Sequence, residues 1–170
     1  MNNNVFSNIA RFILFVLLQV TVFSSFSFFD YFTPYPYVLY VLLFPVNGNK
    51  SALVTSSFFL GLIMDMFLNS GGIHAAACVT IAYLRPNVFR FSFGLSYEYQ
   101  TIKIIGRFTK ERLSFVITSI FIHHLVLFSL EVFKFSFFFR IVSKTFLSTI
   151  FTLLISLLII YLIKPSKKNR

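Results

Sequence analysis

The apolar residues of this chain are gathered into six long runs, and this arrangement constrains the fold more than any other feature. The runs cover residues 9–29, 35–46, 51–68, 72–84, 113–133 and 145–163. A helix that crosses the hydrocarbon core of a bilayer needs about 20 apolar residues and satisfies its own backbone hydrogen bonds. We therefore expect an all-α polytopic membrane protein, a compact bundle of about six transmembrane helices in a single domain over residues 1–170.

The composition supports this interpretation and excludes a large soluble catalytic domain. Hydrophobic residues make up 57% of the chain and charged residues 12%, and the mean hydropathy is +0.82. Both values are far from those of a soluble domain.

The second and fourth runs reach only about 18 to 20 Å, against a hydrocarbon core of about 30 Å. They are expected to extend through flanking residues, to tilt or to be re-entrant. Without tryptophan, tyrosines near the ends of runs, such as Tyr37, are expected at the membrane interface.

The 15 basic residues lie mostly between the apolar runs, so the net charge of +10 indicates membrane topology rather than nucleic-acid binding. With both termini in the cytoplasm, almost all of them fall on the cytoplasmic side. The exceptions are Lys134, Arg140 and Lys144. We therefore predict the N-in, C-in orientation, with a basic cytoplasmic loop at residues 85–112 and a basic cytoplasmic tail at 164–170. Within the loop, the spacing of apolar residues at 102–108 predicts an interfacial helix.

Asp65 is the most informative single residue, because it lies within the third apolar run. An acid at the centre of a spanning helix costs about 2.5 to 3.5 kcal/mol, so its side chain is expected to face protein or water. Three interpretations remain open. Asp65 caps backbone groups near the outer end of its helix, contacts a partner protein, or transfers a proton or ion.

The third and fourth runs carry matching faces of small residues. In the third run, Leu53, Ser57, Gly61 and Asp65 lie four residues apart, so the small residues Ser57 and Gly61 share a helix face with the acid. The corresponding small residues of the fourth run are Ala75, Cys78 and Ala82. Because a glycine pair at 71–72 marks a tight turn between the runs, we predict a helical hairpin packed through these faces.

The remaining polar residues of the apolar runs give no pattern of catalysis or metal binding. His123 and His124 are adjacent and lie on different helix faces, and neither they nor His74 show a metal-ligand spacing. We expect these histidines to hydrogen bond across helices, and Glu131 to pair with Lys134. Residues able to hydrogen bond within or between helices are Gln19, Ser148, Thr152 and Ser156. No catalytic, cofactor-binding or metal-binding residue is predicted.

Short motifs are distributed over the first four apolar runs. They are Leu18-Gln19, Leu42-Leu43-Phe44-Pro45, Gly61-Leu62-x-x-Asp65, Gly72 with Ala75, and Tyr83-Leu84-Arg85. With these motifs, its length, its six-run hydropathy and its short basic tail, the chain resembles the bacterial rod shape-determining protein MreD family. The resemblance extends through nearly the whole chain and is most specific at residues 61–85. The last two runs match in hydrophobic pattern alone.

This resemblance implies a non-enzymatic integral membrane subunit of the rod or elongation complex, which governs cell shape and lateral peptidoglycan synthesis at the bacterial cytoplasmic membrane. The implied partner is MreC, and through it MreB, RodA and a class B penicillin-binding transpeptidase, with no cofactor and no nucleic acid. By matching positions, Gly61, Asp65, Gly72 and Arg85 are implied to shape either the surface that binds MreC or the packing of the core.

Two other classes of function are compatible with a small membrane protein. The small-molecule-binding subunits of energy-coupling-factor vitamin transporters have a similar architecture, which does not settle function. Such a subunit should show a polar, ligand-sized pocket and an Ala-x-x-x-Ala motif for its coupling protein, and the chain contains no Ala-x-x-x-Ala. A membrane enzyme built on Asp65, His74 and Glu131 is the third interpretation.

Overall fold

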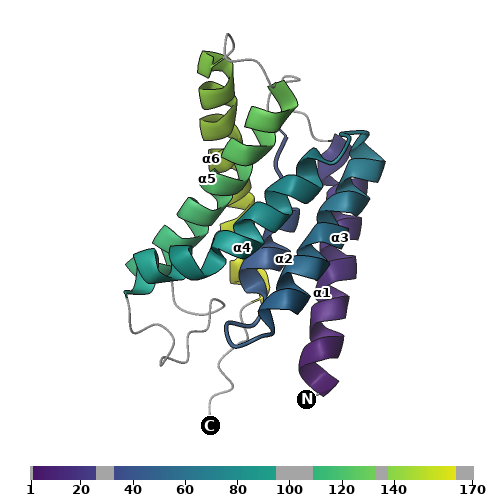
Figure 1. The fold of residues 1–170 in the computed structure, drawn as a ribbon, viewed down its shortest axis with the longest axis vertical. Coiled ribbons are helices and arrows are strands. Elements are labelled where there is room, and N and C mark those ends of the chain that lie inside the picture. The colour runs from purple at the N-terminus through teal and green to yellow at the C-terminus, as the bar shows by residue number, and fades with distance from the viewer. Residues whose placement is uncertain (1, 26–32, 95–108, 133–137, 164–170) are drawn as a thin grey trace.

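The computed structural model describes residues 2–25, 33–94, 109–132 and 138–163, and these residues form helices and no strand. The elements are α1 (Asn2–Thr21), η1 (Phe23–Ser25), η2 (Pro36–Val38), α2 (Leu39–Leu43), α3 (Lys50–Leu68), α4 (Ile73–Phe93), α5 (Lys110–Val132) and α6 (Phe138–Ile163). From α3 to α6, successive helices run in opposite directions (Figure 1). Helix α1 begins and α6 ends at the same end of the bundle, here called the terminal end. The α3–α4 turn, at residues 69–72, lies at the opposite end, here called the turn end.

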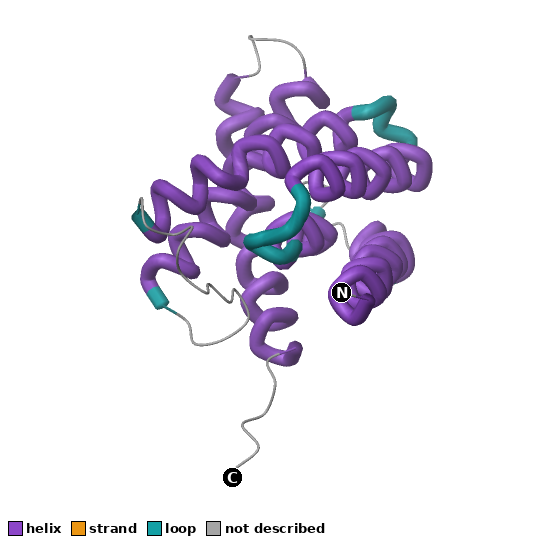
Figure 2. The backbone as a smooth tube through the Cα atoms, turned by 60° about the horizontal axis from the view of Figure 1, so that its bottom comes forward, coloured by secondary structure: helices purple, strands orange, loops and turns teal. Residues whose placement is uncertain are grey.

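Three helices, α3, α5 and α6, are long and apolar enough to cross a membrane. Helix α1 contributes a shorter apolar stretch, Val5–Thr21, and Figure 2 shows it at the edge of the bundle. Large apolar side chains such as Phe6 and Leu17 are exposed along it, which suits a lipid environment better than water. Over the described residues, the predicted all-α bundle is confirmed. Length and composition support a membrane crossing for three of the six α-helices.

The second apolar run forms η2 and α2 and is buried along its whole helical length. Tyr37, Val38 and Leu39 are fully shielded, and they belong to one core with residues from α1, α3, α4 and α5. Pro45 favours extended backbone at Phe44, whose ψ of 143° ends α2 after five residues. The run is short, as predicted. Because it fills the centre of the bundle, the interfacial position predicted for Tyr37 is wrong.

Helix α4 continues well beyond the predicted end of the fourth run at residue 84. It spans 21 residues and ends at Gly94, whose φ of 82° and N–H bond to the Arg90 carbonyl form a C-terminal cap. Extension through flanking residues was one of the outcomes expected for this run. The predicted boundaries of the loop at 85–112 are wrong at both ends, because residues 85–93 belong to α4 and residues 110–112 to α5. The predicted interfacial helix at 102–108 and the tail at 164–170 lie outside the described residues.

The predicted hairpin of α3 and α4 is confirmed, and the predicted small-residue faces of both helices are buried. Leu53, Ser57, Gly61 and Asp65 are all buried on α3. The buried small residues of α4 are Ala75, Ala77, Cys78 and Ala82. The four-residue spacing therefore predicts correctly which side of α3 faces protein.

Candidate functional site

The Asp65 carboxylate caps the N-terminus of the following helix, α4. Its Oδ1 accepts hydrogen bonds from the His74 N–H at 2.9 Å and the Ser70 hydroxyl at 2.6 Å, and its Oδ2 accepts from the Ala75 N–H at 2.9 Å. The first N–H groups of a helix lack partners within the helix, and a negative charge there is favourable. Gly72 occupies the N-cap position of α4 without a side-chain bond. Asp65 therefore supplies from α3 the cap that the local sequence lacks.

The turn that brings Asp65 to this place uses left-handed backbone conformations. Asn69 has φ 52°, and Gly71 and Gly72 have φ 66° and 96°. The Asn69 and Ser70 N–H groups both donate to the Asp65 carbonyl, which closes the end of α3. A β-carbon at Gly72 would meet no neighbouring atom within 4 Å, so the requirement for glycine is conformational rather than steric.

Gly61 lies one helical turn before Asp65, where the backbones of α3 and α4 meet. A β-carbon at Gly61 would lie 2.5 Å from the His74 carbonyl oxygen and 2.6 Å from the Ala75 nitrogen. Both are backbone atoms of the first turn of α4, so they cannot move aside as a flexible side chain would. The absence of a side chain at Gly61 therefore permits the close approach that lets Asp65 reach the N–H groups.

Arg85 lies near the middle of α4 and binds the C-terminal end of α2. Its side chain is 5% exposed, and Nη2 donates to the carbonyls of Leu42, at 3.1 Å, and Phe44. Arg11, from α1, donates to the Leu43 carbonyl at 3.3 Å. The last carbonyls of a helix have no partners within it, and basic side chains satisfy them favourably. Two arginines thus fix the C-terminal end of α2, and the buried segment formed by η2 and α2 is held in place there.

The structure brings three of the four predicted site residues together and separates the fourth. Gly61, Asp65 and Gly72 meet at the turn end, whereas Arg85 lies about three helical turns further along α4. In each place a charged side chain satisfies main-chain groups of its own chain, and Asp65 is 6% exposed. Of the three interpretations of Asp65, its observed contacts are those of a cap.

A buried hydrogen-bonded group around Tyr37, which the sequence did not predict, lies beneath the α3–α4 turn. The Tyr37 hydroxyl is 2.6 Å from Nδ1 of His74 and 3.0 Å from Nε2 of His123. The Cys78 sulfur lies 4.0 Å from the same His123 nitrogen. Tyr37 thereby joins the buried segment to α4 and α5. The sequence predicts that the histidines bond across helices, but it does not identify Tyr37 as their partner.

The second histidine of the pair, His124, bonds to α6. Its Nδ1 is 3.1 Å from the Thr149 hydroxyl, and the Thr152 hydroxyl lies 3.5 Å from its Nε2. The Thr152 hydroxyl also accepts from the Tyr35 N–H at 3.0 Å. Thr152 therefore bonds between helices, and the expectation that the histidines hydrogen bond across helices is confirmed. Gln19 likewise donates to the Pro34 carbonyl at 3.2 Å.

Glu131 at the end of α5 pairs with Lys144 of α6, at 2.6 Å. Its predicted partner, Lys134, lies outside the described residues. The Lys144 ammonium also lies 4.7 Å from the centre of the Phe128 ring. This pair links the ends of α5 and α6. Within the described residues, no group of three or more His, Cys, Asp and Glu side chains is placed to hold a metal ion.

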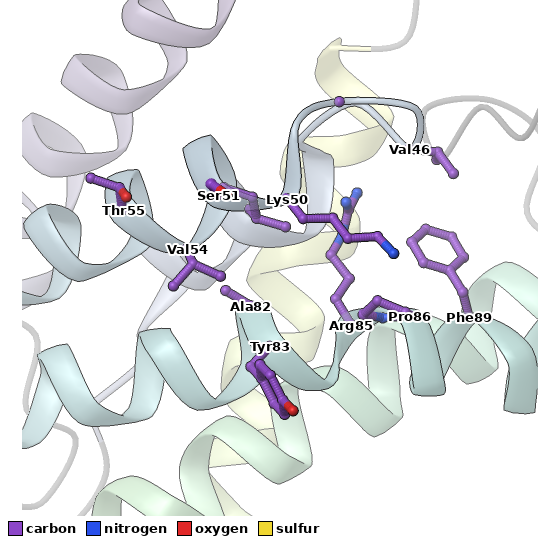
Figure 3. A pocket seen from close by; sticks show the side chains of 12 residues that line it. Val46, Lys50, Ser51, Val54, Thr55, Ala82, Tyr83, Arg85, Pro86 and Phe89 are labelled. Atoms are coloured by element: carbon purple, nitrogen blue, oxygen red, sulfur yellow. The ribbon is translucent and has the colours of Figure 1, made fainter.

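Two cavities flank the hairpin. The turn-end cavity, of about 460 Å³, is lined by polar residues that include Thr33, Asn69, Ser70, His74 and Glu131. The second cavity, of about 500 Å³, lies between the start of α3 and the middle of α4 and is lined by Lys50 and Arg85 among mostly apolar residues (Figure 3).

Comparison with known proteins identifies no relative of this chain. No protein-family model, no curated protein and no solved structure matches it.

Proposed function

We propose that this chain is an MreD-like integral membrane subunit of the bacterial rod or elongation complex, with MreC as its direct partner. Through MreC it would act with MreB, RodA and a class B penicillin-binding transpeptidase in lateral peptidoglycan synthesis and cell shape. Its place in this proposal is the cytoplasmic membrane, with both termini in the cytoplasm and no enzymatic activity of its own. The motif resemblance suggests the complex, and the apolar helices α3, α5 and α6 support the membrane location.

The observation that supports a scaffold role is the set of contacts made by the two charged motif residues, Asp65 and Arg85. The Asp65 carboxylate and the Arg85 guanidinium are both buried and bind main-chain groups of the same chain. An ion-transfer site places its ionisable group near the midplane, and a catalytic acid must reach its substrate. A group that fixes the geometry of a hairpin suits a subunit that offers a rigid surface to partner helices.

The outer face of the hairpin is suited to such contacts. Phe59, Leu62 and Met66 follow one another at three- and four-residue spacing on α3, and all three are exposed, Met66 to 77%. In a membrane this face meets lipid or the helix of a partner such as MreC. Its position relative to α4 depends on Gly61 and Asp65, so disturbance of the hairpin would move the proposed contact surface.

The experiment compares two leucine substitutions in α3. Gly61→Leu places a side chain against the backbone of α4, whereas Ala52→Leu adds a similar side chain at an exposed position of the same helix. We expect Gly61→Leu to reduce recovery of MreC with the tagged protein and to round the cells, and Ala52→Leu to do neither. Normal association and normal cell shape with Gly61→Leu would refute the proposal at this site.

One observation favours the vitamin-transporter subunit as a second candidate. The turn-end cavity has the volume of small-molecule sites, about 300 to 1,000 Å³, and its polar lining could orient a ligand. A transporter subunit should gain thermal stability from a vitamin and co-purify with ATPases and a coupling membrane protein. Absence of both results would exclude this candidate.

A further inference from the structure

The turn-end cavity lies beside the α3–α4 turn and combines hydrogen-bonding groups from distant parts of the chain. Its volume is about 460 Å³, within the range of about 300 to 1,000 Å³ for small-molecule sites. The polar residues of its wall come from η1, the turn, α4 and α5, and they include Ser24, Asn69, Ser70, His74 and Glu131. A ligand in this cavity would therefore contact four separate parts of the fold.

His74 lines this cavity with a side chain that is only 3% exposed. Its Nδ1 is 2.6 Å from the Tyr37 hydroxyl, and Tyr37 does not line the cavity. Its other ring nitrogen, Nε2, has no hydrogen-bond partner among the described residues, and unlike Nδ1 of His123 it is not completely shielded. Nε2 is therefore the polar atom that the His74 ring offers to the cavity.

The hydrogen bonds of Tyr37 determine whether Nε2 of His74 donates or accepts. The Tyr37 hydroxyl has one proton, so it donates to one histidine and accepts from the other, His74 or His123. Nδ1 of His123 is buried without a partner, and a buried N–H without a partner is rarer than a buried acceptor without one. We therefore assign the His123 proton to Nε2, which donates to Tyr37. Tyr37 then donates to Nδ1 of His74, and the His74 proton lies on Nε2 as a donor to the cavity.

The other polar groups of the wall are mainly acceptors. The Ser70 hydroxyl donates to the Asp65 carboxylate at 2.6 Å, and the Ser24 hydroxyl donates to the Val20 carbonyl. A hydroxyl that has given its proton can still accept. The Asn69 side-chain amide adds a donor and an acceptor, and it has no partner among the described residues. The cavity therefore offers donors and acceptors side by side.

The charges around the cavity favour a neutral ligand. Glu131 is the one charged side chain among the described lining residues, and both of its oxygens accept from Lys144, at 2.6 and 2.8 Å. Asp65, behind Ser70 and His74, already accepts three hydrogen bonds. An anion would meet these carboxylates without a lysine or arginine in the described wall, and a cation would compete with Lys144 for Glu131.

We propose that the turn-end cavity binds a neutral sugar, with the Nε2 proton of His74 donated to one of its oxygens. Each sugar hydroxyl both donates and accepts, which matches the mixture of groups in the wall. The C–H groups of a sugar ring would lie against the apolar part of the wall, formed by Leu68, Ile73 and Leu127. The predicted orientation places this end outside the cytoplasm. The site does not depend on the identity of the complex to which the chain belongs.

The test titrates sugars of different charge against the full-length protein. The protein is purified in a zwitterionic detergent, because the headgroups of maltoside and glucoside detergents are themselves neutral sugars. Its thermal stability is measured against the concentration of N-acetylglucosamine, which is neutral, glucosamine, which is cationic, and glucuronate, which is anionic. The stabilisation should saturate and should require about tenfold less N-acetylglucosamine than either charged sugar. A sugar that is merely excluded from the protein surface stabilises without saturation.

Two histidine substitutions separate the cavity from the hydrogen bonds of Tyr37. His74→Phe keeps a ring of similar size and removes the donor, so it should weaken N-acetylglucosamine binding about tenfold, the loss expected for one hydrogen bond. His123→Phe is the matched control, because His123 also bonds to Tyr37 but does not line the cavity. It should leave binding unchanged. Asn69→Gly, at an exposed position whose φ of 52° suits glycine, should weaken binding about threefold.

The possible outcomes separate the proposal from its alternatives. Weaker binding in His74→Phe but not in His123→Phe supports it, whereas equal losses in both variants would show a general effect on the core and overturn it. Stabilisation of wild type that does not saturate, or that is as strong with a charged sugar, would also overturn it. If either histidine variant fails to fold, Asn69→Gly decides, and binding equal to that of wild type refutes the site. Stabilisation by a vitamin and by none of the sugars would contradict the proposal and favour the transporter subunit.

Discussion

Replacement of Asp65 by alanine removes the cap of α4 and leaves two backbone N–H groups without their acceptors. These groups belong to His74 and Ala75, and each donates to the carboxylate at 2.9 Å. A buried donor without a partner costs about 1 to 3 kcal/mol, and loss of a helix cap about 0.5 to 2 kcal/mol. Because Asp65 is 6% exposed, water can replace little of the lost bonding. We expect Asp65→Ala to lower the free energy of unfolding by about 2 to 5 kcal/mol.

The size of this effect should follow the number of acceptor oxygens that remain. Asp65→Asn keeps one oxygen, so it should lose about half as much stability as Asp65→Ala. Purified variants in one detergent are compared by denaturant titration and by heating followed by gel filtration. Glu131→Ala is the control, since it removes an acid whose side chain is 42% exposed and paired with Lys144, a loss of about 0 to 1 kcal/mol. Equal stability of Asp65→Ala and Glu131→Ala would refute the capping argument.

Three further substitutions test other contacts in the same detergent assay, with wild type as reference. Gly61→Ala forces its β-carbon against the backbone of α4 and should destabilise by about 1 to 3 kcal/mol; no loss would mean that the helices do not touch there. Arg85→Met removes the donor to the Leu42 and Phe44 carbonyls and should cost about 2 to 4 kcal/mol; stability equal to that of wild type would contradict this expectation. Tyr37→Phe removes the hydroxyl between two histidines and should cost about 1 to 3 kcal/mol, unless that hydrogen-bonded group is absent.

The features that the sequence predicts correctly are local ones. The four-residue spacing from Leu53 to Asp65 identifies the buried side of α3, and the glycine pair at 71–72 locates the turn. Both follow from helix geometry and backbone freedom, which depend on neighbouring residues alone. The cost of an acid in lipid also implies that Asp65 has partners within the protein, although not which ones.

The features that sequence reasoning missed depend on distant contacts. The fourth apolar run ends at residue 84, yet α4 continues to Phe93, and within it Arg85 binds carbonyls 41 and 43 residues earlier in the chain. A tyrosine in a short apolar run is as compatible with a membrane interface as with a protein core. Only the packing around η2 and α2 places Tyr37 in the core. Hydropathy records how apolar a run is, and it does not distinguish contact with lipid from contact with protein.

The most direct test of the proposed function is identification of the proteins that associate with this chain in its own membranes. The tagged wild-type protein is purified in mild detergent, and co-purifying proteins are identified by mass spectrometry, with an unrelated tagged membrane protein as control. The proposal predicts specific recovery of MreC, RodA and a class B penicillin-binding transpeptidase. Recovery of ATPases with a coupling membrane protein, and none of these three, would contradict it.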